Sequence, residues 1–251
     1  ADAVAAGKYQ VIPLEGPDEV RHLAGSFNRM VKQVQDAMQS QRDLVANVSH
    51  ELKTPLTSIQ GFTQAIVDGI AQTPEQIQQA ASVIQQEASR MSRLVQDLVT
   101  LARLEADTGN STFGEVNVAE LLKSVVEKFT PQAQQAGVNI SAELAEIPLL
   151  SGDADRLVQV FSNLVDNAIK YTPAGGSVTV SACRVKNDRV EVEVVDSGPG
   201  IPAEDREKVF QRFYRRDESK PGVGLGLAIA RQIVTAHGGQ IRVEQNTPRG
   251  S

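Results

Sequence analysis

The pair His50-Glu51, followed by Thr54 and Pro55, combines residue types that can do chemistry within residues 47–62, NVSHELKTPLTSIQGF. An imidazole is a better nucleophile when a carboxylate accepts a hydrogen bond from its other ring nitrogen, and Glu51 could supply that carboxylate. Thr54 lies one helical turn from His50, where its hydroxyl could hold a water. Pro55 has no N–H, so we expect it to disturb the turn that contains His50. The stretch predicts a reactive histidine; an inert surface histidine beside a structural bend is the alternative.

Two amides and an ammonium group share one face of a second predicted helix. Asn163, Asn167 and Lys170 recur at positions i, i+4 and i+7, while apolar residues occupy the opposite side. Amide oxygens are suitable ligands for Mg²⁺, and an ammonium group attracts phosphate. The strip therefore predicts a binding face for a metal–phosphate group, or else an ordinary solvated face of a surface helix.

Two glycine-rich segments follow. In residues 196–202, DSGPGIP, a carboxylate at the end of a predicted strand precedes Gly198 and Gly200. The same residues are also typical of a simple turn. In residues 222–228, GVGLGLA, the glycines open a helix, whose free N–H groups can meet an anion. No strand directly precedes the second segment and no Gly-Lys-Ser/Thr ends it, which argues against a dinucleotide-binding fold and a P-loop.

Composition limits the class of protein that must position these residues. The chain has 251 residues with 41% hydrophobic and 22% charged residues, as in globular proteins of two or three domains. Its net charge of −6 repels nucleic acid. Cys183 is the only cysteine, which favours a reducing, intracellular setting. We find no run of about 18 apolar residues that would predict a membrane span, so we expect a soluble piece.

The apolar pattern predicts two long amphipathic helices in residues 26–104. Apolar residues recur every three or four positions over 26–70, with Val48 and Leu52 pointing away from His50, which should therefore face water. Gly69 ends this helix, and Thr73-Pro74 begins the next. A single hairpin leaves half of its apolar seam in water. Two copies would bury the seam as a four-helix bundle, so we expect a homodimer.

Beyond residue 110 the pattern predicts an α+β domain with a mixed sheet covered by helices. Helices are expected at 118–130, from Asp153 to Tyr171, and at 224–237. Strands are expected at 138–144, 149–150, 177–184, 189–195 and 240–244, with a hairpin turn at Lys186-Asn187-Asp188. The predicted domains are thus 1–35, a lead-in segment; 36–107, the helical hairpin; and 111–251, the α+β domain.

The five motifs, in order, resemble those of sensor histidine kinases. Residues 49–57 resemble the H-box, 163–171 the N-box, 196–202 the G1 box, 209–215 the F-box and 222–228 the G2 box. The resemblance implies that His50 accepts a phosphoryl group, that Asn167 and Asn163 bind Mg²⁺, that Asp196 binds adenine and that Arg215 reaches the γ-phosphate. It further implies nucleotide contacts from the following residues: Asn163, Asn167, Lys170, Tyr171, Asp196, Gly198, Gly200, Ile201, Phe213, Gly222, Gly224, Leu225, Gly226 and Leu227.

By this resemblance the α+β domain is a sandwich of the Bergerat (GHKL) type that binds ATP, with a lid from about Pro199 to Gly222. His50 would pass its phosphoryl group to an aspartate of a response-regulator receiver domain, and Thr54 could serve a reverse phosphatase activity. Residues 1–35 resemble the latter part of a HAMP linker, which implies the cytoplasmic portion of a membrane-anchored receptor. Two alternatives stay open: an ATPase of the same superfamily and a non-catalytic dimeric scaffold. The ATPase is disfavoured because Asn163 stands where those enzymes have a glutamate that acts as the base for hydrolysis.

Overall fold

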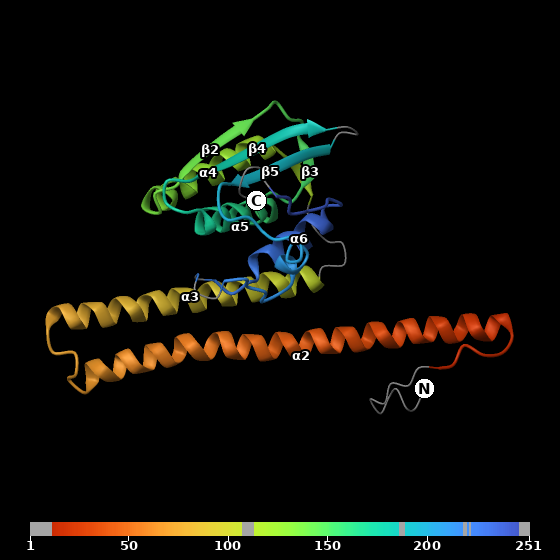
Figure 1. The fold of residues 1–251 in the computed structure, drawn as a ribbon, viewed down its shortest axis with the longest axis horizontal. Coiled ribbons are helices and arrows are strands. Elements are labelled where there is room, and N and C mark those ends of the chain that lie inside the picture. The colour runs from red at the N-terminus through yellow and green to blue at the C-terminus, as the bar shows by residue number, and fades with distance from the viewer. Residues whose placement is uncertain (1–11, 107–112, 186–188, 218–219, 221, 246–251) are drawn as a thin grey trace. The chain divides into compact units, whose positions relative to one another are not determined.

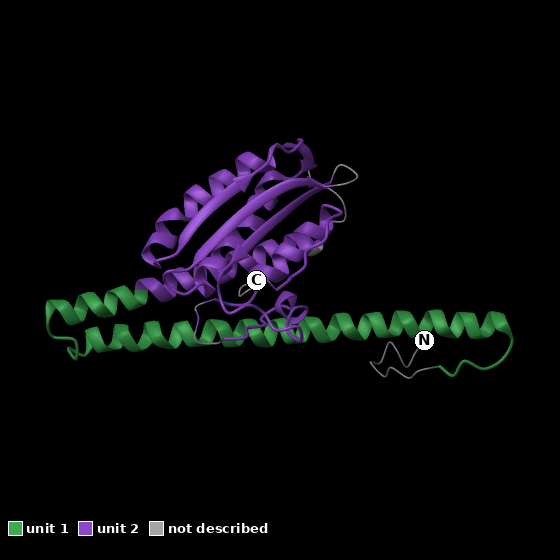
Figure 2. Cartoon of the chain, turned by 45° about the horizontal axis from the view of Figure 1, so that its top comes forward, with its two compact units in different colours: residues 1–84 green, residues 85–251 purple. Residues whose placement is uncertain are grey.

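The computed structural model describes residues 12–106, 113–185, 189–217, 220 and 222–245. The chain divides into two compact units, residues 1–84 and residues 85–251, so that the division falls inside one long helix (Figure 2). The expected turn at 186–188 lies outside the described residues.

The first unit is dominated by α2, Asp18–Val67, the long helix along the foot of Figure 1. It begins earlier than the apolar seam alone predicts and includes the lead-in residues 18–25. Asn28 holds the preceding extended segment: its side chain accepts a hydrogen bond from the Ile12 N–H at 2.9 Å and donates one to the Ile12 carbonyl at 2.8 Å. Pro55 is buried inside α2, and the helix continues through it. The predicted disturbance is therefore not a break in the helix.

The reversal after α2 follows the sequence closely. Gly69 takes a φ of 67°, the left-handed conformation that ends many helices. Thr73 caps the next helix, since its hydroxyl accepts a hydrogen bond from the Gln76 N–H at 3.2 Å while the Gln76 side chain accepts one from the Thr73 N–H. Helix α3, Pro74–Ala106, then runs back antiparallel to α2 over its first turns, as both views show (Figures 1 and 2). The predicted hairpin turn is confirmed.

The second unit contains two sheets. Strands β2 (Asn139–Leu144), β4 (Ser177–Val185) and β5 (Arg189–Asp196) form a mixed sheet, in which β2 is parallel and β5 antiparallel to β4. The short strands β1 (Gly114–Val116) and β3 (Leu150–Gly152) pair antiparallel. Strand β1 was not predicted, because three residues are too few for a period-2 pattern to stand out.

Helices α4 (Val118–Gln135) and α5 (Ala154–Tyr171) pack on the mixed sheet and on each other, and α6 (Gly226–Ala236) packs on α5 (Figure 1). Asp153 caps α5 as predicted, because its carboxylate accepts a hydrogen bond from the Arg156 N–H at 3.1 Å. The core between sheet and helices is fully buried aliphatic side chains: Leu122, Val125, Val165, Val178, Val180, Ile229 and Ile233. The structure confirms the predicted layered α/β architecture.

One expected strand is missing. Residues 240–245 alternate half-buried Ile241 and Val243 with exposed Arg242 and Glu244, but they form no strand. Their contact with β5 is made by side chains, where Arg242 forms an ion pair with Glu191 at 2.7 Å. The prediction of a strand at 240–244 was wrong because alternation in burial does not require backbone pairing. None of the helices in the described part of the chain is both long and apolar enough to cross a membrane.

Candidate functional site: a nucleotide cavity and an exposed histidine

His50 lies on α2 in the first unit and is exposed, as the helical phase predicts. Its neighbour Glu51 is half-buried and Thr54 is exposed. The Thr54 hydroxyl donates to the His50 carbonyl oxygen at 3.5 Å, which is long for a hydrogen bond. This turn therefore presents an imidazole and a weakly held hydroxyl to solvent above a buried proline.

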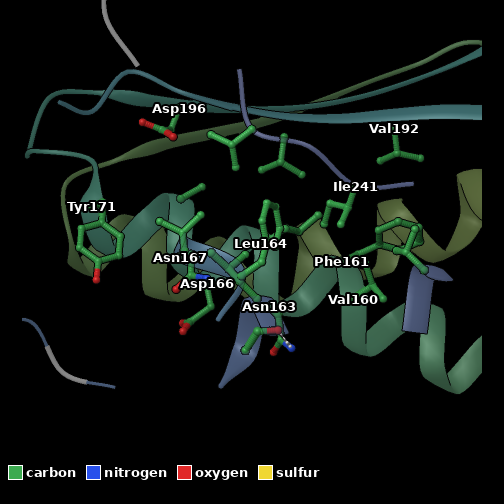
Figure 3. A pocket seen from close by; sticks show the side chains of 18 of the residues that line it. Val160, Phe161, Asn163, Leu164, Asp166, Asn167, Tyr171, Val192, Asp196 and Ile241 are labelled. Carbon is green, nitrogen blue, oxygen red and sulfur yellow. Dashed lines mark hydrogen bonds between the residues drawn. The ribbon is translucent and has the colours of Figure 1, made fainter. Parts of the chain in front are cut away.

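In the second unit, the amide strip of α5 lines a cavity (Figure 3). Asn163 and Asn167 are half-buried on the same side of the helix as Asp166, while Phe161 and Val160 are buried. The Asn163 side-chain nitrogen donates to the Gly226 carbonyl oxygen at 2.9 Å, so α5 is tied to the first residue of α6. This bond orients the amide and leaves its oxygen as the group able to bind a cation.

Lys170 ends the strip next to the second glycine segment. A Cβ at Gly222 would lie 2.8 Å from the Lys170 Nζ, and the same Nζ lies 5.0 Å from the centre of the Tyr171 ring. Desolvation lowers the pKa of Lys170, and the charges of Arg215 and Lys220 lower it further against the opposing effect of Asp166 and Asp217. Burial likewise raises the pKa of Tyr171. The positive charges of Lys170, Arg215 and Lys220 therefore lie close together, and that of Lys170 is partly desolvated.

Asp196 ends β5 and is only 7% exposed, one of few buried polar residues in the described chain. Its carboxylate accepts a hydrogen bond from the Gly198 N–H at 2.7 Å. A Cβ at Gly198 would lie 2.7 Å from the same carboxylate oxygen and 2.9 Å from the Tyr171 carbonyl oxygen. The φ of Gly198 is not in the left-handed region. Glycine is required there because a side chain would collide with these two oxygens.

The glycines before α6 are held against the F-box segment. Gly224 has a φ of 78°, its carbonyl accepts a hydrogen bond from the Phe213 N–H at 2.9 Å, and a Cβ on it would lie 2.7 Å from the Tyr214 carbonyl oxygen. Phe213 itself has a φ of 62°, unusual for a residue with a side chain. Strain of this kind is concentrated at functional sites.

Three contacts of the lid were not predicted. Arg215 donates to the Lys220 carbonyl oxygen at 2.7 Å, whereas the adjacent Arg216 donates to the Gly200 carbonyl oxygen at 2.8 Å. The Tyr214 hydroxyl hydrogen-bonds the Asp205 carboxylate, which lowers the pKa of Asp205. The run Arg-Phe-Tyr-Arg-Arg was a visible signal, but nothing in the sequence separates the roles of its last two arginines.

The structure brings the predicted nucleotide residues of the second unit together. A cavity of about 1580 Å³ is lined by both asparagines, Lys170, Tyr171, Asp196 and residues of the two glycine segments, with Ile201, Arg215 and Leu227. Phe213 and Gly198 do not line it; the backbone of Phe213 lies against Gly224. His50, Glu51 and Thr54 belong to the other unit. Within the described residues, no three His, Cys, Asp or Glu side chains are grouped to hold a metal ion.

Protein-family models match the chain in three consecutive segments. These are the HAMP domain at residues 1–36, the His Kinase A phospho-acceptor domain at 40–107, and the histidine kinase-, DNA gyrase B- and HSP90-like ATPase at 152–251. The chain belongs to the sensor histidine kinase family. Sensor protein SrrB of Staphylococcus aureus (strain N315) is a relative of this chain, 38% identical over 218 residues, which are 85% of this chain and 37% of SrrB.

Solved structures of similar fold support the same assignment. Full-length ShkA in complex with AMPPNP matches this chain at 31% identity with a TM-score of 0.63, over 83% of this chain and 44% of ShkA. Histidine kinase ThkA in complex with response regulator protein TrrA matches at 28% identity with a TM-score of 0.69, over 86% of this chain and 61% of the other. The chain spans just over a third of the length of its relative SrrB.

Proposed function

We propose that this chain is an ATP-dependent protein-histidine kinase that phosphorylates its own His50 and transfers the phosphoryl group to an aspartate of a response-regulator receiver domain. One observation carries the proposal: the N-box strip, Asp196 and the glycines before α6 line a single cavity in one unit, while the other unit offers an exposed histidine on a long helix. A nucleotide site and an acceptor are the two parts that such a reaction needs.

The base-binding role falls to Asp196. The Gly198 N–H donates to one of its carboxylate oxygens, so the carboxylate is held in place at the cavity, where it can accept a hydrogen bond from the amino group of adenine. Because Asp196 is buried, a base that offers no donor there would gain no hydrogen bond in return for desolvating the site. ShkA binds the adenine nucleotide analogue AMPPNP, which supports the same ligand class for this chain.

The phosphate-binding role falls to the α5 strip and the lid. The side-chain nitrogen of Asn163 is hydrogen-bonded to Gly226, so its side-chain oxygen is the atom that can bind Mg²⁺. Asn167 lines the same cavity. Mg²⁺ held by these amides would offset phosphate charge, and such ions are normally completed by phosphate and water. Lys170 and Arg215 add positive charge on the same side. The N–H groups at the start of α6 can donate hydrogen bonds to a phosphate.

The acceptor role falls to His50. Its exposure leaves the imidazole open to a nucleotide presented by the second unit. Glu51 orients the ring, so that one nitrogen attacks the γ-phosphorus while the other keeps its proton toward the carboxylate. Arg215 offsets the charge on the transferring group. Thr54 positions a water for the reverse activity, dephosphorylation of the regulator.

The partners follow from the helical unit and the family. Apolar side chains stay exposed along the hairpin, among them Val45, Leu56, Ile77 and Val95. A second copy of the chain would cover them in a four-helix bundle, which makes the kinase a homodimer. ThkA is solved with response regulator TrrA, which supports a receiver domain as the second partner. The HAMP match supports a cytoplasmic position below a membrane-anchored sensor; nucleic acid is not a partner of this acidic chain.

The test is to incubate the chain with γ-labelled ATP and Mg²⁺ and to measure label on the protein and free phosphate together. We expect acid-labile, base-stable label that is absent in His50→Gln, with little free phosphate. Free phosphate without protein label would favour an ATPase of the same superfamily. Neither product, from folded wild-type chain, would favour a non-catalytic scaffold.

A further inference from the structure

Adjacent arginines in the lid reach different sides of the nucleotide cavity. Arg215 donates to Lys220 within the lid, and its charge acts on Lys170 and Tyr171, on the phosphate side. Arg216 instead donates from Nη1 to the carbonyl oxygen of Gly200 at 2.8 Å. Gly200 stands in the loop that follows Asp196, on the side expected to receive the base. The lid segment is therefore bonded to the base-side loop through Arg216.

The partner of Arg216 is a backbone atom in an unusual conformation. Gly200 has a φ of 72°, in the left-handed region, and its loop lines the cavity. A guanidinium group can meet this carbonyl only while the loop keeps that conformation, so the bond favours one shape of the loop. Since Arg216 is exposed and Gly200 half-buried, the bond holds the loop from its solvent side.

A second link joins the same two segments. The Tyr214 hydroxyl hydrogen-bonds the Asp205 carboxylate, which lies five residues after Gly200. Asp205 also forms an ion pair with Lys208 at 3.1 Å, and the positive charge of Arg216 lies near the Asp205 carboxylate. The base-side loop is thus attached at two points to the segment Tyr214–Arg216, by Arg216 at Gly200 and by Tyr214 at Asp205.

We propose that Arg216 is a positioning residue of the nucleotide site: by bonding Gly200 it keeps the base-side loop in the shape that receives adenine. The inference rests on the proposed nucleotide-binding function. Arg216 acts through Gly200 and makes no contact with the phosphates. Its contribution is preorganisation, which lowers the cost of ordering the loop when a nucleotide binds.

The two possible roles of an arginine here predict different nucleotide profiles. ADP and ATP share the base and differ in the γ-phosphate. An arginine that shapes the base-side loop must weaken both ligands by the same factor when it is removed. An arginine that contacts the γ-phosphate must weaken ATP alone. We expect Arg216→Ala to lower the affinity for ADP and for ATP equally, by about fivefold to tenfold, as for the loss of one charge-assisted hydrogen bond in a loop.

The experiment measures the dissociation constants of ADP and ATP with Mg²⁺ for the full chain by calorimetry, with autophosphorylation kinetics alongside. Arg216→Ala should raise KM for ATP and leave kcat near the wild-type value. Arg216→Lys should restore part of the affinity, because an ammonium group can still donate to the Gly200 carbonyl. The matched control is Arg242→Ala, which removes an exposed arginine bonded to Glu191 and Glu244 in the same unit.

Equal ADP affinity in Arg216→Ala and Arg242→Ala would overturn the inference, and so would a loss confined to ATP. Failure of the wild-type chain to bind either nucleotide would instead refute the proposed function itself. The melting temperature of each variant without nucleotide identifies general unfolding. If Arg216→Ala melts early, Arg216→Gln is compared in its place, since it keeps a donor of shorter reach without the charge.

Discussion

The side-chain amide of Asn163 donates a 2.9 Å hydrogen bond to the carbonyl oxygen of Gly226, which joins the middle of α5 to the start of α6. The two residues are 63 positions apart, and a Cβ on Gly226 would lie 3.4 Å from the Asn163 Cγ. One residue of the proposed metal site thus also fixes the helix start that would receive phosphate.

This double role separates the two asparagines of the N-box. We expect Asn163→Ala to lower the free energy of unfolding without nucleotide by about 1 kcal/mol, because it removes the side-chain hydrogen bond that joins α5 to the Gly226 carbonyl. Asn167→Ala should weaken Mg²⁺-dependent ATP binding with a smaller loss of stability. Urea unfolding of both variants, with and without nucleotide, checks this difference. The same stability loss in both would contradict the structural role of Asn163.

Gly198 supplies a second prediction. Because a Cβ there would meet the Asp196 carboxylate and a backbone carbonyl, Gly198→Ala should displace Asp196, destabilise the unit by about 1–3 kcal/mol and abolish measurable ATP binding. Gly114→Ala is the control, since nothing lies within 4 Å of its Cβ position. Calorimetric titration with ATP is the measurement. Normal binding by Gly198→Ala would show that the close approach does not shape the base site.

Asp97 on α3 should make stability depend on pH in the reverse of the usual carboxylate sense. Burial raises its pKa to about 6, against a weaker opposing effect of Arg93. The folded chain therefore holds more protons than the unfolded chain between about pH 4 and pH 6, and stability falls as the pH rises through this window. Above about pH 6 the ionised, partly buried Asp97 carboxylate exerts its full destabilising effect.

Asp97→Asn should remove this effect and raise the free energy of unfolding at pH 7 by about 1 kcal/mol, a figure discounted because Asp97 is partly exposed. Urea unfolding at pH 5 and pH 7 measures it, with Glu127→Gln, an exposed carboxylate on α4, as the control. Identical pH dependence in Asp97→Asn and wild type would contradict the assignment.

Thr54 and Thr57 offer a matched pair on α2. The Thr57 hydroxyl bonds the Lys53 carbonyl oxygen at 2.9 Å, whereas that of Thr54 is held only weakly. We expect Thr54→Ala to keep autophosphorylation and to lose dephosphorylation of the regulator, while Thr57→Ala keeps both. The assay follows the release of phosphate from a phosphorylated receiver domain. An unchanged rate in Thr54→Ala would remove this residue from the phosphatase reaction.

Periodic segments were predictable because burial repeats with the helix or strand. The caps at Thr73 and Asp153 and the exposure of His50 all follow from local spacing. Spacing was less decisive along a long helix: on α3 Leu94 is only 1% exposed, whereas its neighbour Val95, one of the apolar residues that a second copy would cover, is 50% exposed in the single chain. A single helix face in a 33-residue helix cannot be assigned from spacing alone.

The site was predictable as a set of motifs but not as a network. Asp196, Asn167 and the glycines could be named because their chemistry is visible in the sequence. The bonds from Asn163 to Gly226 and from Arg216 to Gly200 end on backbone carbonyls far along the chain, which carry no residue-type signal. Phe213 could be predicted as a site residue, but its positive φ and the contact of its backbone with Gly224 depend on how the lid folds.

Mass spectrometry that locates the phosphoryl group after incubation with ATP and Mg²⁺ tests the central claim most directly. The chain has three histidines, His22, His50 and His237, so the acceptor can be identified among them. The account predicts phosphate on His50 in the wild type and on no histidine in Asp196→Asn, whose base site is altered. Phosphate on another histidine, or undiminished phosphate on His50 in Asp196→Asn, would contradict it.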